Sequence, residues 1–228
     1  MITRSLIATL LIAIPGMGKE PKRPTPPTIL GPGVYSIDEL PENTHGAWLG
    51  LVQGSDGRWS LKKVTVAVRR TELKGDDPGR PTGYSVAPIG NEHVMLLMRG
   101  IPVKAGKKQI RVAKDYRSLA KTPGEQSIVG SMDNTDFRAW GEPIPGSNKV
   151  AVKLSWNDRL QELYTLTDDE QNSWDILWAG DLDGDGAPDF ILAIAEGSLG
   201  EQRLLLSSQA GPDELVGLAG GHKYGFGD

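Results

Sequence analysis

Turn-forming residues interrupt this sequence about every ten residues from Gly33 to the C-terminus, and this spacing constrains the fold more than any other feature. The segments between the turns are rich in β-branched residues or alternate between apolar and polar residues, as strands of antiparallel sheets do. The 29 glycines and 16 prolines among 228 residues leave little room for long helices. We therefore predict a single all-β or β-rich domain, made of two packed antiparallel sheets or one strongly bent sheet.

The apolar pattern places the individual strands. Two short segments, 38–42 and 115–121, are predicted to be helical, and a change of apolar parity between Leu61 and Val64 predicts a bulge near Lys62. Strands are predicted at residues 47–52, 59–68, 93–98, 109–112, 137–140, 150–156, 160–166, 174–178, 190–195, 203–208 and 215–218.

The segments on either side of Asn157 are predicted to form a hairpin. If all their apolar residues share one face, Trp156 lies opposite Leu160, which requires a three-residue loop. A two-residue turn would instead put Val152 opposite Leu163 and split the apolar face. We therefore predict the three-residue loop.

The first 33 residues have the features of an export signal followed by a tether. Residues 1–18 contain a basic start at Arg4, an apolar run and small residues before a cleavage site after Gly18. The apolar run is too short for a bilayer, which requires roughly 20 residues, and no later segment predicts a membrane span. Residues 19–33 carry five prolines and are predicted to be an extended linker. The folded domain is predicted to cover 34–228, and the protein to be periplasmic or secreted.

Charge and cysteine content exclude several classes of protein. The formal net charge of −4 excludes a polybasic nucleic-acid binder, so no nucleic-acid partner is expected. The chain has no cysteine, which excludes a disulfide scaffold, thiolate catalysis and cysteine-ligated metal sites.

The most specific motif is DLDGDGAPD at residues 181–189, between two apolar segments. It places oxygen donors at positions 1, 3, 5, 7 and 9 of a loop, with a glycine at position 6 that permits a sharp turn, as a looped calcium site requires. We predict a calcium site there. The predicted ligands are Asp181, Asp183, Asp185, the backbone carbonyl of Ala187, and Asp189, which binds directly or through water.

Four carboxylates in so short a loop repel one another unless a cation lies between them. At about 5 Å and an effective dielectric constant near 20, each close pair costs on the order of 3 kcal/mol. A flexible loop of oxygen donors suits calcium better than the smaller magnesium ion. The alternative is a metal-free turn stabilised by hydrogen bonds from backbone amides to the Asp side chains.

The loop is not an EF-hand, because position 12 is Leu192 instead of a bidentate Glu and the flanks are strand-like. Residues 178–209 resemble the calcium repeats of the FG-GAP and VCBS type, which occur in integrin-like β-propellers. That resemblance implies an ion held between two strands by the carboxylates and the Ala187 carbonyl. A propeller typically has four to eight blades, whereas the motif occurs once, so a complete propeller is not expected.

Other features point less specifically to function. The six tryptophans are expected to pack in the core or in hairpins, and Trp174, Ile176 and Trp178 form the best candidate for an aromatic platform. Residues 104–121 carry seven basic residues against Asp115, a local charge of 7 − 1 = +6, expected to be a solvated face or a patch for anionic glycans.

No local catalytic motif is present, and no catalytic residue or organic cofactor is predicted. We expect an exported, non-catalytic calcium-binding β module in which the ion stabilises a strand connection. Its partner is open, with an anionic glycan or an envelope protein as possibilities. The alternative is a calcium-stabilised hydrolase of envelope polysaccharide, since such enzymes need no local motif.

Overall fold

The computed structural model describes residues 27–42, 44–73, 75–90, 93–104, 111–112, 114–119, 123–124 and 126–225. The predicted signal peptide, residues 1–18, lies outside these residues. The described strands are β1 Thr28–Leu30, β2 Gly33–Ser36, β3 Gly46–Gln53, β4 Trp59–Thr71, β5 Gly83–Pro88, β6 His93–Arg99, β7 Arg111–Val112, β8 Lys114–Leu119, β9 Ser127–Met132, β10 Thr135–Pro143, β11 Lys149–Trp156, β12 Arg159–Thr167, β13 Ser173–Asp181, β14 Asp189–Glu196, β15 Leu199–Leu206 and β16 Gly217–Gly225. Two short 3₁₀ helices are η1 Ile37–Glu39 and η2 Ser207–Gln209.

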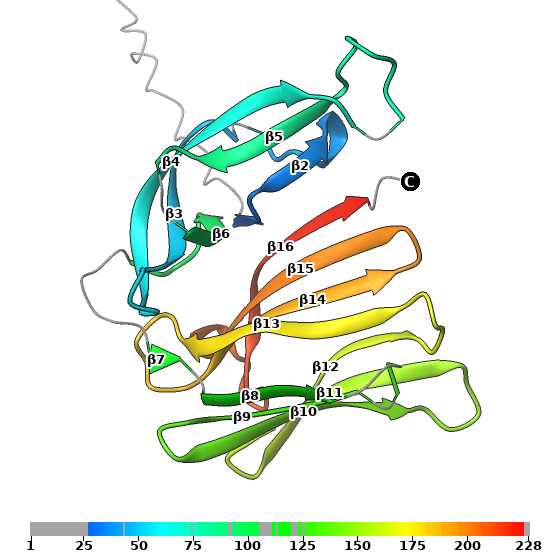
Figure 1. Ribbon diagram of the computed structural model, residues 1–228. Helices are drawn as coiled ribbons and strands as arrows, with labels where there is room; N and C mark the ends of the chain where they lie inside the picture. Colours follow the sequence, from blue (N-terminus) through cyan, green and yellow to red (C-terminus); the bar gives the residue numbers. More distant parts are fainter. Residues whose placement is uncertain are drawn as a thin grey trace, which may run out of the picture.

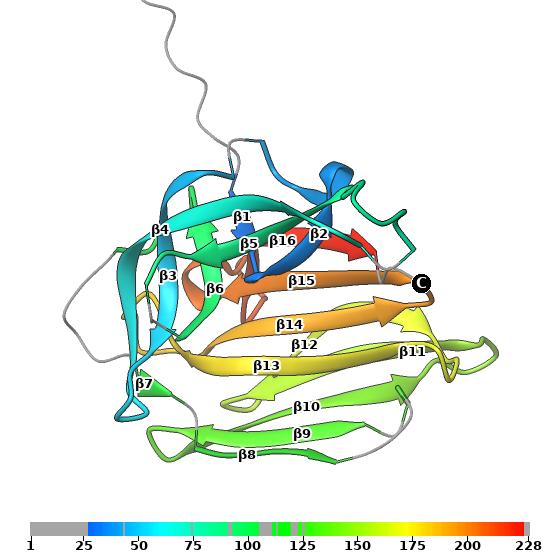
Figure 2. The same ribbon diagram turned by 45° about the horizontal axis from the view of Figure 1, so that its top comes forward.

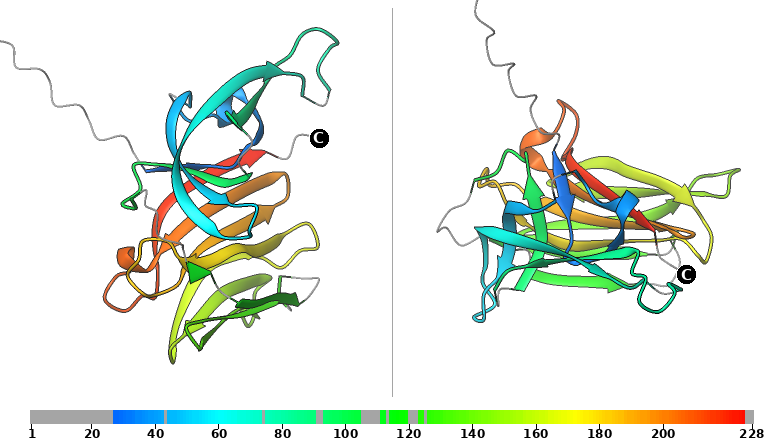
Figure 3. Two further views of the ribbon diagram at one scale, coloured as in Figure 1. Left: turned by 60° about the vertical axis from the view of Figure 1, so that its left-hand side comes forward. Right: turned by 90° about the horizontal axis from the view of Figure 1, so that it is seen from above.

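The described strands form two sheets (Figure 1). Eleven strands form a large sheet in the order β2-β5-β4-β3-β6-β1-β16-β15-β14-β13-β7, and five form a smaller sheet in the order β12-β11-β10-β9-β8. The large sheet is strongly curled, so that β3 and β4 arch over β13–β16, and the smaller sheet lies below β13–β16 (Figures 1 and 3). The predicted all-β class is confirmed, with a bent sheet and a packed second sheet in the same molecule.

Strands β13–β15 are the middle layer between two apolar cores (Figure 2). On β14, Phe190, Leu192 and Ile194 face the core shared with the five-stranded sheet. Ile191 faces the second core, to which β3, β4 and β6 contribute. Both faces of β14 are therefore buried, which explains why its sequence is a continuous apolar run instead of an alternating one.

Strand β1 corrects the predicted domain boundary. Residues 28–30 were expected to belong to the linker, yet they pair with β6 on one side and with β16 on the other. Ile29 and Leu30 are fully buried. The three residues between Pro27 and Pro32 that form β1 are apolar or β-branched, so the prolines mark the ends of a strand and do not prevent it. The folded domain begins before Val34.

The predicted helices are the clearest errors of secondary structure. Residues 115–119 of the predicted helix 115–121 belong to strand β8, which pairs with β9 in the smaller sheet. Segment 38–42 was placed nearly correctly but forms only the short η1, where the Glu39 carboxylate accepts a hydrogen bond from the Ser36 amide at 2.6 Å.

Strands β1, β2, β5 and β9 were not predicted, and β16 is longer than predicted. The full length of β16 was not predicted because the strand contains several glycines. Glycine weakens a strand interior and is common in strands where another chain segment comes close. A Cβ at Gly217 would lie 1.9 Å from the Gln209 carbonyl oxygen, and one at Gly220 would lie 2.9 Å from an Ile101 methyl group. These two glycines allow the backbone to approach its neighbours.

The β11–β12 hairpin corrects the predicted loop. Trp156 pairs with Arg159 across a two-residue turn, in which Asn157 and Asp158 have φ values of 52° and 60°. Further along, a bulge shifts the register so that Val152 faces Tyr164. The bulge puts Tyr164 and Leu166 on the same face as Val152 and Val150, whereas Leu160 is left exposed on the opposite face.

The bulge predicted near Lys62 is absent, since β4 pairs with β3 and with β5 without a register shift. Leu61 and Val64 are buried on opposite faces, in separate cores. The parity change therefore marks the place along β4 where the buried side chains switch from one face of the curled sheet to the other.

Candidate metal site

The acidic loop connects the two central strands of the middle layer. Asp181 is the last residue of β13 and Asp189 the first residue of β14, and Gly180 pairs with Asp189 across the strands. The turn between them uses Gly184 and Gly186 at φ values of 86° and 96°, which glycine adopts without steric strain. The strand pairing thus brings the two ends of the motif side by side.

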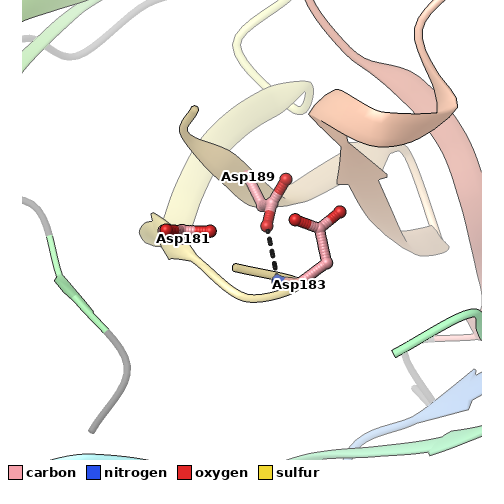
Figure 4. Close-up of side chains that lie close together, drawn as sticks. All are labelled: Asp181, Asp183 and Asp189. Atoms are coloured by element: carbon pink, nitrogen blue, oxygen red, sulfur yellow. Dashed lines mark hydrogen bonds between the residues drawn. The ribbon is translucent and has the colours of Figure 1, made fainter. Parts of the chain in front are cut away.

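Three of the predicted ligands converge in this loop (Figure 4). Carboxylate oxygens of Asp181, Asp183 and Asp189 all lie within 4.8 Å of one another. Asp189 is fully buried, Asp181 is 6% exposed and Asp183 is half-buried. This buried cluster of three carboxylates could hold a metal ion.

Asp189 is the structural centre of the site. Its Oδ2 accepts hydrogen bonds from the Leu182 amide at 2.6 Å and the Asp183 amide at 3.3 Å. Its Oδ1 accepts from the amide and the hydroxyl of Ser207, at 2.8 and 2.9 Å. One carboxylate therefore joins the start of the loop to η2, which follows β15.

Asp183 makes a second link to η2, because its Oδ2 accepts a hydrogen bond from the Ser208 hydroxyl at 2.5 Å. Sequence reasoning missed both serines. Their only signal was their position, directly after an apolar strand, and nothing local in the sequence shows that this position lies beside residues 181–189.

Asp185 lies outside the convergent group. It is exposed, and its carboxylate accepts hydrogen bonds from the Ala187 amide at 2.8 Å and the Ser207 hydroxyl at 2.9 Å. Of the five predicted ligands, three side chains meet, Asp185 lies beside them, and Ala187 is tied to Asp185 through its amide.

Burial, together with the charge of Asp183, raises the pKa of the Asp189 carboxyl to about 7. Hydrogen bonds from Ser207 and Leu182 act in the opposite direction and are outweighed. Among the described residues, no Lys or Arg forms an ion pair with Asp183 or Asp189. The buried negative charge therefore favours a bound cation or a proton.

The hydrogen bonds expected of a metal-free turn are also present. The Gly184 amide donates to the Asp181 carboxylate at 2.7 Å, and the Asp185 amide donates to the Asp183 carboxylate at 3.2 Å. Such turns stabilise the loop backbone, but they need neither a buried carboxylate nor three carboxylates that meet. The donor set of hard oxygens fits calcium or magnesium and not a soft metal.

The burial of Asp189 predicts how the stability of the protein depends on pH. A carboxyl whose pKa rises from 3.8 to about 7 on folding contributes stability below about pH 4 that is lost as the pH rises to about 7. In chelator, the unmutated protein should therefore lose stability relative to Asp189→Asn between pH 5 and pH 8, as measured by urea denaturation. Parallel profiles for the two proteins would contradict the raised pKa.

The other sequence candidates lie elsewhere. Trp174, Ile176 and Trp178 are buried in two different cores, so they form no exposed aromatic platform. Half of the basic segment 104–121 lies outside the described residues, and of β7 and β8 only the backbone is described. His222 is buried between Tyr35 and Tyr224, and burial lowers its pKa.

Comparisons with known proteins found no match: no family model matches the chain, and no curated protein or solved structure is significantly similar to it. Within the described part of the chain, no helix has the length and apolar character that crossing a membrane requires. The resemblance of residues 178–209 to FG-GAP and VCBS repeats stays a prediction.

Proposed function

We propose that this protein is an exported, non-catalytic calcium-binding β module. The ion fastens the β13–β14 connection to the turn that follows β15. The observation that carries the proposal is the convergence of Asp181, Asp183 and fully buried Asp189 within 4.8 Å.

The mechanical role follows from where the loop lies. Ser207 and Ser208 already donate hydrogen bonds to the Asp189 and Asp183 carboxylates. A cation that relieves the repulsion between these carboxylates would therefore stabilise a contact between segments about 20 residues apart. β14 and β15 are neighbours in the middle layer, on which both cores pack. Calcium at this point would therefore stabilise the whole sandwich and not only the loop.

Calcium is the proposed ion because the loop offers only oxygen donors, to which the Ala187 carbonyl and the Asp185 carboxylate would add. The proposed export fits this choice. Extracellular calcium modules bind with dissociation constants of about 10⁻⁴ to 10⁻³ M, which only a calcium-rich medium saturates.

Calcium should raise the melting temperature of the purified protein. Millimolar calcium at about ten times the dissociation constant stabilises by roughly 1.4 kcal/mol through mass action, a shift of about 3–6 °C for a domain of this size. Asp183→Ala should abolish the calcium-dependent shift and keep the fold, as measured by scanning calorimetry in calcium and in chelator.

Asp77→Ala is the matched control, because Asp77 is an exposed loop residue far from the site in sequence. This variant should keep the full shift. Equal melting curves of the unmutated protein in calcium and in chelator would defeat the proposal, and an equal shift with magnesium alone would correct the ion.

The alternative function, a polysaccharide hydrolase, requires a general acid shielded from water. Away from the metal loop, Asp136 and Asp158 line a groove of about 560 Å³, and both are exposed. This arrangement favours a surface that binds over one that hydrolyses.

A further inference from the structure

One face of the five-stranded sheet is turned away from β13–β16 (Figure 1). This outer face carries a groove. We call it the outer groove. It has a volume of about 560 Å³, within the range of small-molecule sites, and its main lining residues are Asp136, Trp140, Ser155, Trp156, Asp158 and Leu160.

The sheet register explains why this face is hollow. Arg138 and Leu160 both lie opposite Ser155, on its two neighbouring strands. The small side chain of Ser155 therefore forms the bottom of the groove, between two longer side chains. The turns at Asp133–Asn134 and Asn157–Asp158 lie at the same end of the sheet. All four turn residues have positive φ values, between 50° and 66°.

Trp140 is an ordered aromatic wall of the groove. Its indole Nε1 donates to the Glu142 carboxylate at 3.3 Å, and the Arg138 guanidinium lies 5.3 Å from its ring centroid. The ring is only half-buried. Because neighbours already hold the indole, a ligand that stacks on it loses little conformational entropy.

The charges around the groove balance. Asp136 and Asp158 are matched by Arg138 and Arg159, and nearby Lys153 forms an ion pair with Glu142 at 2.7 Å. A balanced surface gives no net attraction to a polyanion. It does present carboxylate, amide and guanidinium groups, which pair with hydroxyl groups as acceptors and donors.

We propose that the outer groove binds a neutral oligosaccharide of pyranose units. The apolar C–H face of a sugar ring stacks on Trp140 or lies against Leu160, which is 54% exposed, while the hydroxyl groups bond the polar rim. A second hollow of about 430 Å³ shares Asp136 and Ser155 with the groove, which gives room for more than one sugar unit.

This proposal does not depend on the metal site, which lies between other strands. Titration calorimetry with cellohexaose, maltohexaose and chitohexaose tests it on the full folded chain, in calcium and in chelator. At least one of these probes should bind with a dissociation constant of about 1 mM or tighter.

Two variants locate the binding. Trp140→Ala removes the aromatic wall, and Ser155→Arg fills the floor from a half-exposed position without removing any core side chain. Each should weaken binding about tenfold or more. Tyr84→Ala is the matched control, because Tyr84 is a half-buried aromatic on the other sheet that also lies under an arginine; it should leave the affinity unchanged.

If Trp140→Ala fails to fold by circular dichroism, Ser155→Arg decides the question. The proposal is overturned if no probe binds at about 10 mM, if Ser155→Arg leaves binding unchanged, or if only an anionic polymer such as polygalacturonate binds. Binding that persists in chelator separates this result from the calcium proposal.

Discussion

Replacing Ile29 with alanine should lower the free energy of unfolding by about 2–5 kcal/mol, the cost of removing a large aliphatic side chain from a packed core. Ile29 is fully buried and belongs to the core on the curled side of the large sheet. Its strand, β1, is also the link between β6 and β16 in the sheet order. A cavity at Ile29 therefore lies at the junction of the two halves of the sheet.

Urea denaturation of Ile29→Ala beside Val34→Ala measures this effect. Val34 lies in β2, the next strand along the chain, but is 54% exposed, so its truncation should change stability by less than about 0.5 kcal/mol. If both variants were as stable as the unmutated protein, residues 28–30 would be a tether after all.

Asp189→Ala should cost about 3 kcal/mol or more in millimolar calcium at neutral pH. The substitution removes the acceptor for the Leu182 amide and for the Ser207 amide and hydroxyl. A buried donor left without a partner costs about 1–3 kcal/mol. The loss of ion binding would add to this cost through mass action.

Asp213→Ala is the control for this variant, because Asp213 is exposed and follows η2 closely in the sequence. It should be neutral in the same denaturation experiment. An Asp189→Ala protein as stable as Asp213→Ala would show that the loop does not support the middle layer. The pH series of Asp189→Asn tests the charge of the same residue separately.

The two proposals assign different tasks to different sheets. The metal loop lies in the large sheet, at the end of the middle layer, where an ion would affect stability. The outer groove lies on the smaller sheet, where a ligand can reach it without disturbing either core. A chain with this division could present a sugar-binding face whose scaffold depends on calcium.

The sequence by itself determined the β-rich class and the three aspartates that meet in the loop. Both depend on local spacing: turn residues at short intervals exclude long helices, and alternate aspartates within nine positions can meet through backbone geometry alone. The convergence of Asp181, Asp183 and Asp189 follows from the pairing of the two strands that flank them.

Only the tertiary structure decided the features that depend on distant partners. Residues 114–119 became a strand because β9 offers an edge, and residues 28–30 became one because β6 and β16 lie on either side. Ser207 reached Asp189 through the β14–β15 pairing. In each case the stabilising contact joins residues that are not neighbours in the sequence, and local composition does not show on which surface a segment packs.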